Sequence, residues 1–229
     1  MKHILFTLSL LAIATAAMAS DFTVDKITYE ITSQQTVSIV SADSTIQSAN
    51  LMPTVTHQGI TYSVTSIGVH AFANCYSLSS VTIPSSVTSI EMGAFEACSS
   101  LTSIIIPNSV TSIGNHAFYE CESLAAITIS DNLTHIDGQT FDETAFYKDP
   151  SNWEDGVLYL GNCLLATQSD ISGEYSIKEG TRLIDASAFS HSELLTAITI
   201  PNSVTTIEWL AFSYCTSLST INYTGTMEQ

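Results

Sequence analysis

Apolar residues recur along this chain in a fixed pattern. The segment V-T-x-I-x-x-x-A-F-x-x-C-x-S-L-x-x-[VI]-x-I-P begins at Val64 and returns from Val87, and it returns without the final proline from Val110. Its phenylalanine stands, at a constant interval of 23 residues, at Phe72, Phe95, Phe118 and Phe141. A period of roughly 20 to 50 residues is the signature of a solenoid, in which each repeat packs on its neighbours.

Each repeat predicts one strand, one corner and one turn. The stretch from Leu78 to Ile83 alternates apolar and polar positions, as a half-buried strand does. Repetition stacks such strands into a parallel sheet, and the following proline ends the ladder because it has no N–H. V-T-x-I then turns the corner, and Ala-Phe lies in a short helical or 3₁₀ turn. The pattern predicts a solenoid, α/β to mostly β, with short parallel strands on one face and these turns on the other.

The first 19 residues have the pattern of a secretory signal peptide. Lys2 supplies a positive charge, residues 4–17 are mostly apolar, and Ala17-Met18-Ala19 resembles a cleavage site. The apolar run is too short to span a bilayer, and no second run of that kind follows. We therefore expect an exported chain, secreted or at the cell surface, without a membrane span.

Residues 20–63 precede the clear repeats and are predicted to form an N-terminal β cap. Apolar residues alternate with polar ones in 22–24, 27–31 and 37–39, which is strand periodicity. His57-Gln58-Gly59 predicts a turn between strands in 54–56 and 60–64. A cap of this kind covers the apolar end that the first rung of a solenoid exposes.

The repeats occupy residues 64–229, with rungs that begin at residues 64, 87, 110, 133, 181 and 204. After the fourth rung the period is broken, and we expect a hairpin insertion at about 145–173. Two apolar runs, 157–160 and 163–166, are joined there by Gly161-Asn162, which is typical of a β-hairpin. No capping element follows the last strand before Gln229, so either the chain is a fragment, which we favour, or Tyr223 and Trp209 partly cover that end.

Five cysteines in an exported protein could form disulfides. However, Cys75, Cys98 and Cys121 share one repeat position, and their side chains point the same way into the core. The equivalent residue is Ser192 in one later rung and Cys215 in the last. We therefore predict reduced, buried thiols that act as small apolar groups. Cys163 lies in an apolar run and is also predicted to be a core residue.

The net charge of −17 makes nucleic acid a poor partner and disfavours anionic membranes. Solubility explains this charge most simply. A surface that recruits Ca²⁺ or basic partners is the alternative, although no D-x-[DN]-x-[DN]-G calcium loop is present.

No set of catalytic or metal-binding residues converges in the sequence. His70 and His116 share a repeat position but are two rungs apart, too far to share one zinc ion. Carboxylates gather around the insertion, at Asp142, Glu143, Asp149, Glu154 and Asp155. A paired-carboxylate glycosidase site is conceivable there, but a solvated acidic loop fits better. We predict a protein without catalytic residues, metal or cofactor.

The repeat V-T-x-I-x-x-x-A-F-x-x-C-x-S-L-x-x-I-x-I-P resembles the BspA-like leucine-rich repeats of bacterial cell-surface proteins, also called the Treponema pallidum type. The resemblance covers residues 51–226 and implies a leucine-rich repeat solenoid. Pro-x-Ser stands where other leucine-rich repeats carry an Asn ladder. The resemblance also implies an exported adhesin that binds host fibronectin or fibrinogen, or promotes aggregation between bacteria.

The outward positions of the strands are the candidate ligand-binding face, because side chains alternate across a strand. None of these residues carries a charge: Ser80, Thr82, Ser103, Ile105, Ala126, Thr128, Ala197, Thr199, Thr220 and Asn222. Candidate aromatic anchors are Trp153, Tyr159 and Trp209, although Trp153 could instead pack on its own hairpin. The alternative is that the face is soluble, β-compatible filler.

The leading hypothesis is therefore a non-enzymatic surface protein that mediates protein–protein binding or adhesion. The alternatives are a structural spacer in a longer surface protein and a glycan-binding accessory.

Overall fold

The computed structural model describes residues 21–225, so the predicted signal peptide and the last residues of the final rung lie outside the described residues. The N-terminal part contains strands β1 (Phe22–Val24), β2 (Ile27–Ile31), β3 (Thr36–Ala42), β4 (Ser48–Asn50), β5 (Thr54–His57) and β6 (Ile60–Ile67). The regular rungs add β7 (Ser80–Thr82), β8 (Ser89–Ile90), β9 (Ser103–Ile105), β10 (Ser112–Ile113), β11 (Ala126–Thr128) and β12 (His135–Ile136).

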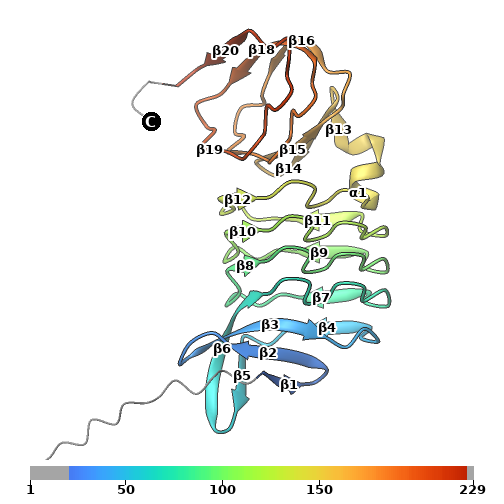
Figure 1. Ribbon diagram of the computed structural model, residues 1–229, viewed down its shortest axis with the longest axis vertical. Helices are drawn as coiled ribbons and strands as arrows, with labels where there is room; N and C mark the ends of the chain where they lie inside the picture. Colours follow the sequence, from blue (N-terminus) through green and yellow to red (C-terminus); the bar gives the residue numbers. More distant parts are fainter. Residues whose placement is uncertain (1–20, 226–229) are drawn as a thin grey trace, which may run out of the picture.

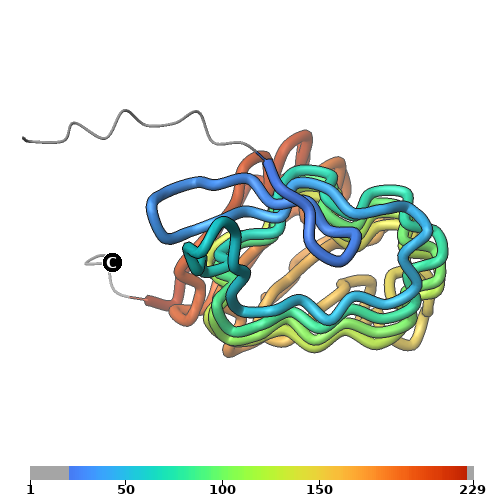
Figure 2. The backbone as a smooth tube through the Cα atoms, turned by 90° about the horizontal axis from the view of Figure 1, so that it is seen from below, coloured from blue at the N-terminus to red at the C-terminus, as the bar shows by residue number. Residues whose placement is uncertain are grey.

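The period is interrupted by two short helices, α1 (Ala145–Lys148) and η1 (Pro150–Asn152). The remaining strands are β13 (Trp153–Glu154), β14 (Val157–Leu160), β15 (Cys163–Thr167), β16 (Ser172–Ser176), β17 (Leu183–Ile184), β18 (Leu194–Ile200), β19 (Thr206–Ile207) and β20 (Thr220–Tyr223). The elements form a stack of rungs with β1 at one end and β20 at the other (Figure 1). Seen along the stack, the regular rungs superpose as flattened loops (Figure 2).

Two parallel ladders hold the regular rungs together. At the corner, β6, β8, β10 and β12 pair in register, so that Ile67, Ile90, Ile113 and Ile136 stack on one another. On the broad face, β4 pairs with β7 and β9 pairs with β11. The predicted strands are therefore confirmed, and the V-T-x-I corner adds a second ladder because its residues are extended enough to pair.

A column of phenylalanine rings fills the space between strands and turns. Phe72, Phe95, Phe118 and Phe141 are stacked, with successive ring centroids 5.0, 5.2 and 5.4 Å apart. All four side chains are buried. The sequence period therefore sets the spacing of the core, because identical positions must lie one strand separation apart.

Each Ala-Phe turn divides its backbone N–H groups between two rungs. The N–H groups of Ala71, Ala73 and Cys75 donate to carbonyls three residues earlier, so the segment is a series of turns and not the short helical or 3₁₀ turn that the sequence predicts. Those of His70, Phe72 and Asn74 donate to the next rung instead. This alternation requires left-handed backbone at the two flanking positions, where φ is 54° at His70 and 61° at Asn74.

The N-terminal strands continue the stack. β1 pairs antiparallel with β2, β2 antiparallel with β3, and β3 parallel with β6, so that Ile39 lies opposite Ile67. β5 and β6 form an antiparallel hairpin that closes between His57 and Ile60, as the His57-Gln58-Gly59 turn predicts. The segment thus covers the N-terminal side of the first rung (Figure 1).

The insertion contains a hairpin whose two faces belong to different cores. β14 and β15 pair antiparallel across Gly161-Asn162. Leu158 and Cys163 are buried in the core of the N-terminal rungs, whereas Val157 and Leu164 are buried in the core of the last rungs. The hairpin is therefore an internal wall, which explains its uninterrupted apolar runs.

The stack breaks at this wall. β12 ends one sheet, and the next sheet has the order β13-β14-β15-β17-β19, in which β15, β17 and β19 are parallel. On the broad face, β16, β18 and β20 likewise form a sheet of their own. Figure 1 shows this last block turned relative to the regular rungs, with α1 and β13 beside the break.

Candidate functional site

We name the strands up to β12 the N-terminal block and those from β15 to β20 the C-terminal block. In the N-terminal block, every candidate position of the broad face is exposed. The exposed residues are Ser80, Thr82, Ser103, Ile105, Ala126 and Thr128, and the side chain of Ile105 is 70% exposed. They lie on β7, β9 and β11, and their alternate neighbours point inward, as with Ile104. The result is an uncharged, mostly hydroxyl-bearing surface, which we name the strand face.

The C-terminal block departs from the predicted pattern. Thr220 and Asn222 are exposed and Thr199 is half-buried, but Ala197 is buried. Ala197 lies between Glu174 of β16 and Thr220 of β20, so its single methyl group is covered by longer neighbours. The expectation that Ala197 faces solvent is therefore wrong. Because β11 does not pair with β16, these positions also form a separate patch and do not extend the strand face.

Trp153 packs within the insertion. Its indole Nε1 donates to the carbonyl oxygen of Tyr147 at 2.8 Å, and the two rings meet edge to face with centroids 5.2 Å apart. The side chain is half-buried against the N-terminal core. Of the two readings that the sequence left open for Trp153, packing on its own segment is the one that these contacts support.

Tyr159 is also engaged by its surroundings. Its hydroxyl lies 2.9 Å from that of Tyr175, and the ammonium group of Lys178 lies 5.6 Å from its ring centroid. Burial, followed by the hydrogen bond from Tyr159, raises the pKa of Tyr175. Tyr159 therefore fixes the hairpin against β16.

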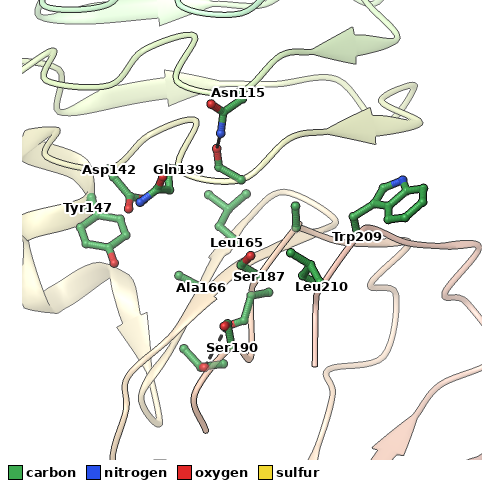
Figure 3. A pocket seen from close by; sticks show the side chains of 14 residues that line it. Asn115, Gln139, Asp142, Tyr147, Leu165, Ala166, Ser187, Ser190, Trp209 and Leu210 are labelled. Atoms are coloured by element: carbon green, nitrogen blue, oxygen red, sulfur yellow. Dashed lines mark hydrogen bonds between the residues drawn. The ribbon is translucent and has the colours of Figure 1, made fainter. Parts of the chain in front are cut away.

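Trp209 is 83% exposed and lies beside Leu210, which is 65% exposed. Both residues line a pocket of about 480 Å³ at the break in the stack. We name it the junction pocket. Gln139 and Asp142 of the fourth rung form one wall, and Ser187 and Ser190 of the fifth rung form another. Tyr147 and Trp209 lie on opposite sides of it (Figure 3).

The junction pocket is acidic. Burial, together with the charge of Glu143, raises the pKa of Asp142 from 3.8 to about 6, although His116 opposes this shift. Asp185 directly precedes Ala186, which lines the pocket. Burial raises the pKa of Asp185 well above its ordinary value, although its carboxylate accepts a hydrogen bond from the N–H of Ala186. No Lys or Arg forms an ion pair with Asp142 in residues 21–225.

The other carboxylates of the insertion are exposed, as expected of a solvated acidic loop. Glu143 pairs with Lys148 at 2.7 Å, and Glu154 pairs with Lys178 at 2.9 Å. Asp149 caps η1 by accepting from the N–H of Ser151. These contacts are local and structural.

The cysteines are free thiols, and Cys75, Cys98, Cys121 and Cys163 are buried. Burial raises the pKa of Cys75 to about 11 and that of Cys163 to about 12. The Sγ of Cys98 donates to the carbonyl oxygen of Phe72 in the preceding rung at 3.2 Å. Buried packing positions are thus confirmed for these four cysteines, and Ser192 is buried at the repeat position of Cys75, Cys98 and Cys121.

The histidines that share a repeat position do not meet. His70 is half-exposed and lies 3.2 Å from Glu96, whereas His116 contacts Gln139 at 2.9 Å. Residues 21–225 contain no group of three or more His, Cys, Asp or Glu side chains arranged to hold a metal ion. In the same part of the chain, no helix has the length and apolar character needed to cross a membrane.

The stacked rungs, the phenylalanine column and the Ala-Phe turns together define a leucine-rich-repeat solenoid, a class of protein suited to binding other proteins. Residues 50–171 and 165–229 match the BspA type leucine rich repeat region, in six copies. The chain belongs to this family.

Three solved structures illustrate the similarity. A leucine rich cell surface protein from Faecalibacterium prausnitzii is 19% identical, with 91% of this chain and 96% of that one covered and a TM-score of 0.38. The leucine rich repeat protein of T. pallidum is 23% identical, with 88% and 71% covered and a TM-score of 0.45. The pneumococcal vaccine antigen PcpA is 13% identical, with 90% and 70% covered and a TM-score of 0.41. A search of curated proteins gives no match.

Proposed function

We propose that this chain is an exported, non-enzymatic protein that binds a protein ligand at the bacterial surface. The observation that carries the proposal is the strand face, which is exposed, uncharged and rigid. Its backbone is held by parallel ladders on β4, β7, β9 and β11, so its hydroxyl groups are presented at fixed spacing. Hydroxyl-rich surfaces supply adaptable hydrogen bonds to protein ligands.

Ile105 is the apolar centre of this surface. It is 70% exposed and flanked by small residues, with Thr128 opposite it on β11. A large apolar side chain in such a place is a candidate hot spot, because its burial on binding removes apolar area from water. The resemblance to BspA-like proteins makes fibronectin and fibrinogen the first ligands to test.

The test is binding of residues 20–229 to immobilised fibronectin and fibrinogen, with albumin as the negative control. We expect saturable binding to one of them, and we expect Ile105→Asp to weaken it about tenfold or more. Ile221→Asp is the matched control, because Ile221 is also exposed, at 62%, but lies on β20, away from the strand face.

Binding that Ile105→Asp leaves unchanged would move the site away from the strand face. Absence of binding to either protein at micromolar concentration would overturn the adhesin proposal and favour a spacer role.

A further inference from the structure

The regular stack is completed by a ladder of turn-to-turn hydrogen bonds. In the second rung, the N–H groups of Gly93, Phe95 and Ala97 donate to the carbonyl oxygens of the third rung at 2.9, 2.8 and 2.8 Å. The fifth rung repeats the arrangement, since Ser187, Phe189 and His191 donate to the sixth at 3.1, 2.7 and 2.9 Å. The third rung makes two such bonds, from Phe118 to Thr140 and from Glu120 to Asp142, so two or three N–H groups per turn donate to the next rung.

The fourth rung has these donors but no acceptors for them. Its equivalent residues are Gln139, Phe141 and Glu143, and the turn has the same shape, with φ of 61° at Gln139 and 65° at Glu143. Within the described part of the chain, none of these three N–H groups donates to another backbone group. Phe141 itself is buried, and an unmet backbone donor costs free energy wherever water does not reach it.

One turn is missing at the next level. β15 occupies that level at the corner, where Leu164 pairs with Ile184 of the fifth rung. Beyond Leu164 the chain stays extended and pairs with β14, so it makes no Ala-Phe turn. The junction pocket lies where this turn would be, between Gln139 and Asp142 on one side and Ser190 on the other (Figure 3).

The opposite wall has one open backbone acceptor. In the third rung, the carbonyl oxygens of Asn115, Ala117 and Tyr119 accept from the preceding rung. The equivalents in the fifth rung are Ala186, Ala188 and Ser190. Ala188 accepts from the hydroxyl of Thr167, and the carbonyl oxygen of Ala186 lies against Gly138 of the fourth rung, where a Cβ would be 2.9 Å from it. Ser190 accepts from no backbone N–H in residues 21–225. A backbone segment at the open end of the pocket can therefore pair with the donors of the fourth rung and with the carbonyl oxygen of Ser190, because it carries donors and acceptors in alternation.

The negative charge around the junction pocket favours a basic side chain in such a segment. Asp142 lines the pocket without an ion-pair partner, and Asp137, Glu143 and Glu208 also contribute negative charge around the junction. Lys148 is engaged by Glu143. The exposed indole of Trp209 at the rim can receive a cation over its face. A basic side chain therefore fits this pocket, and an acidic one does not.

We propose that the junction pocket binds an extended, Lys- or Arg-containing segment of a protein partner, whose backbone replaces the missing turn and whose basic side chain reaches Asp142. This inference rests on the proposed function, that the chain binds protein. In the stack, Tyr119 and Asp142 occupy the same turn position, so a basic residue at that position of an added turn would lie directly over Asp142.

The probe is an acetylated, amidated peptide with the sequence of residues 114–124 and the changes Tyr119→Lys, Glu120→Gln, Cys121→Ser and Glu122→Gln. A peptide with Tyr119→Glu in place of Tyr119→Lys is the charge control. We expect the Lys peptide to bind residues 20–229 about tenfold or more tightly than the Glu peptide, because only the former pairs with Asp142. Equal affinities, or no binding of either, would overturn the proposal.

Amide hydrogen exchange locates the bound peptide. Saturation with the Lys peptide is expected to protect the amides of Gln139, Phe141 and Glu143, while those of Phe95 and Phe118, already bonded to the next rung, stay unchanged. Binding without protection of residues 139–143 would overturn the proposal.

Two pairs of variants separate the site from the rest of the stack. Ser190→Trp fills the pocket and is expected to abolish peptide binding, whereas Ser213→Trp changes the same turn position in the last rung, outside the pocket. Asp142→Asn is expected to weaken the Lys peptide about tenfold, and Glu96→Gln is its match in an intact rung. The Asn variant keeps the test decisive if Ser190→Trp does not fold.

The two proposals fail separately. If a protein ligand binds and is sensitive to Ile105→Asp but not to Ser190→Trp or Asp142→Asn, the junction inference falls and the strand-face function stands. If the Lys peptide protects residues 139–143 but neither fibronectin nor fibrinogen binds, the junction inference stands and the choice of adhesin ligands falls.

Discussion

The imidazole Nδ1 of His135 lies 2.9 Å from Oε1 of Glu208, although the two residues are 73 positions apart. His135 is in the fourth rung and Glu208 is in the sixth, so the contact spans the break. Nearby, the guanidinium of Arg182 donates to the carbonyl oxygen of Asp131 at 3.0 Å. These contacts hold the two blocks at one angle where no sheet continues from β12 to β15.

A double-mutant cycle tests the contact between His135 and Glu208. His135→Ala and Glu208→Gln are each expected to lower the free energy of unfolding by at most about 1 kcal/mol, because the imidazole is 65% exposed and solvent screens the pair. Urea unfolding of the two single variants and the double variant measures the coupling, which is expected to be favourable. Strictly additive losses would mean that the pair does not fix the junction.

The phenylalanine column is expected to dominate stability. Phe95→Ala removes a fully buried ring that stacks between Phe72 and Phe118, and should cost about 3–5 kcal/mol. Ser103→Ala, on the exposed strand face, should change the free energy of unfolding by less than about 0.5 kcal/mol. Chemical denaturation of both variants provides the measurement, and similar losses would contradict the division into core and strand face.

The cysteine column is expected to resist alkylation. The thiolate is the reactive form, and burial raises the pKa of Cys75, Cys163 and Cys215. With iodoacetamide at pH 8, the folded protein should be modified first at Cys215, the only cysteine of the described chain that is not fully buried. Mass spectrometry should find all five modified in denaturant, and early modification of Cys98 in native buffer would contradict its burial.

The carboxylates at the junction predict an unusual pH dependence. The pKa of Asp142 is raised from 3.8 to about 6, so between these values the folded protein binds more protons than the unfolded chain. Its contribution to stability therefore falls as pH rises through this window. Burial also raises the pKa of Asp185, so its contribution to stability likewise falls as pH rises.

Asp185→Asn is expected to raise the free energy of unfolding at pH 7, because it removes a buried charge and keeps an acceptor for the N–H of Ala186. Asp149→Asn is the control with equal net charge, and it should be neutral or destabilising because hydrogen bonds from Ser151 lower the pKa of Asp149. Urea unfolding from pH 4 to pH 8 compares them. A gain for both variants would point to net charge alone.

The regular rungs could be predicted from the sequence because their contacts are local in the repeat. Phe95 meets Phe72 and Phe118 whenever rungs stack in register, and Ile90 meets Ile67 and Ile113 for the same reason. The hairpin at Gly161-Asn162 was also predictable, since turn chemistry is local. The candidate residues of β7 and β9 followed from simple alternation.

The junction could not be predicted in this way. Ala197 is at an outward position by alternation, yet its neighbours on β16 and β20 bury it. Trp153 offered two readings in the sequence, and only its contact with Tyr147 distinguishes them. Gln139 and Ser190 have no motif that marks them as pocket residues.

By itself, the sequence determined the rungs, their order, the buried column and the small thiol position, because a repeat that cannot bury its apolar face alone must stack on its neighbours. Only the tertiary structure decided what happens where the period fails. There the hairpin β14–β15 buries one face in each of two cores, a turn is left out, and His135 meets Glu208. The physical reason is that these contacts join segments with no common repeat position, so packing, and not periodicity, sets their geometry.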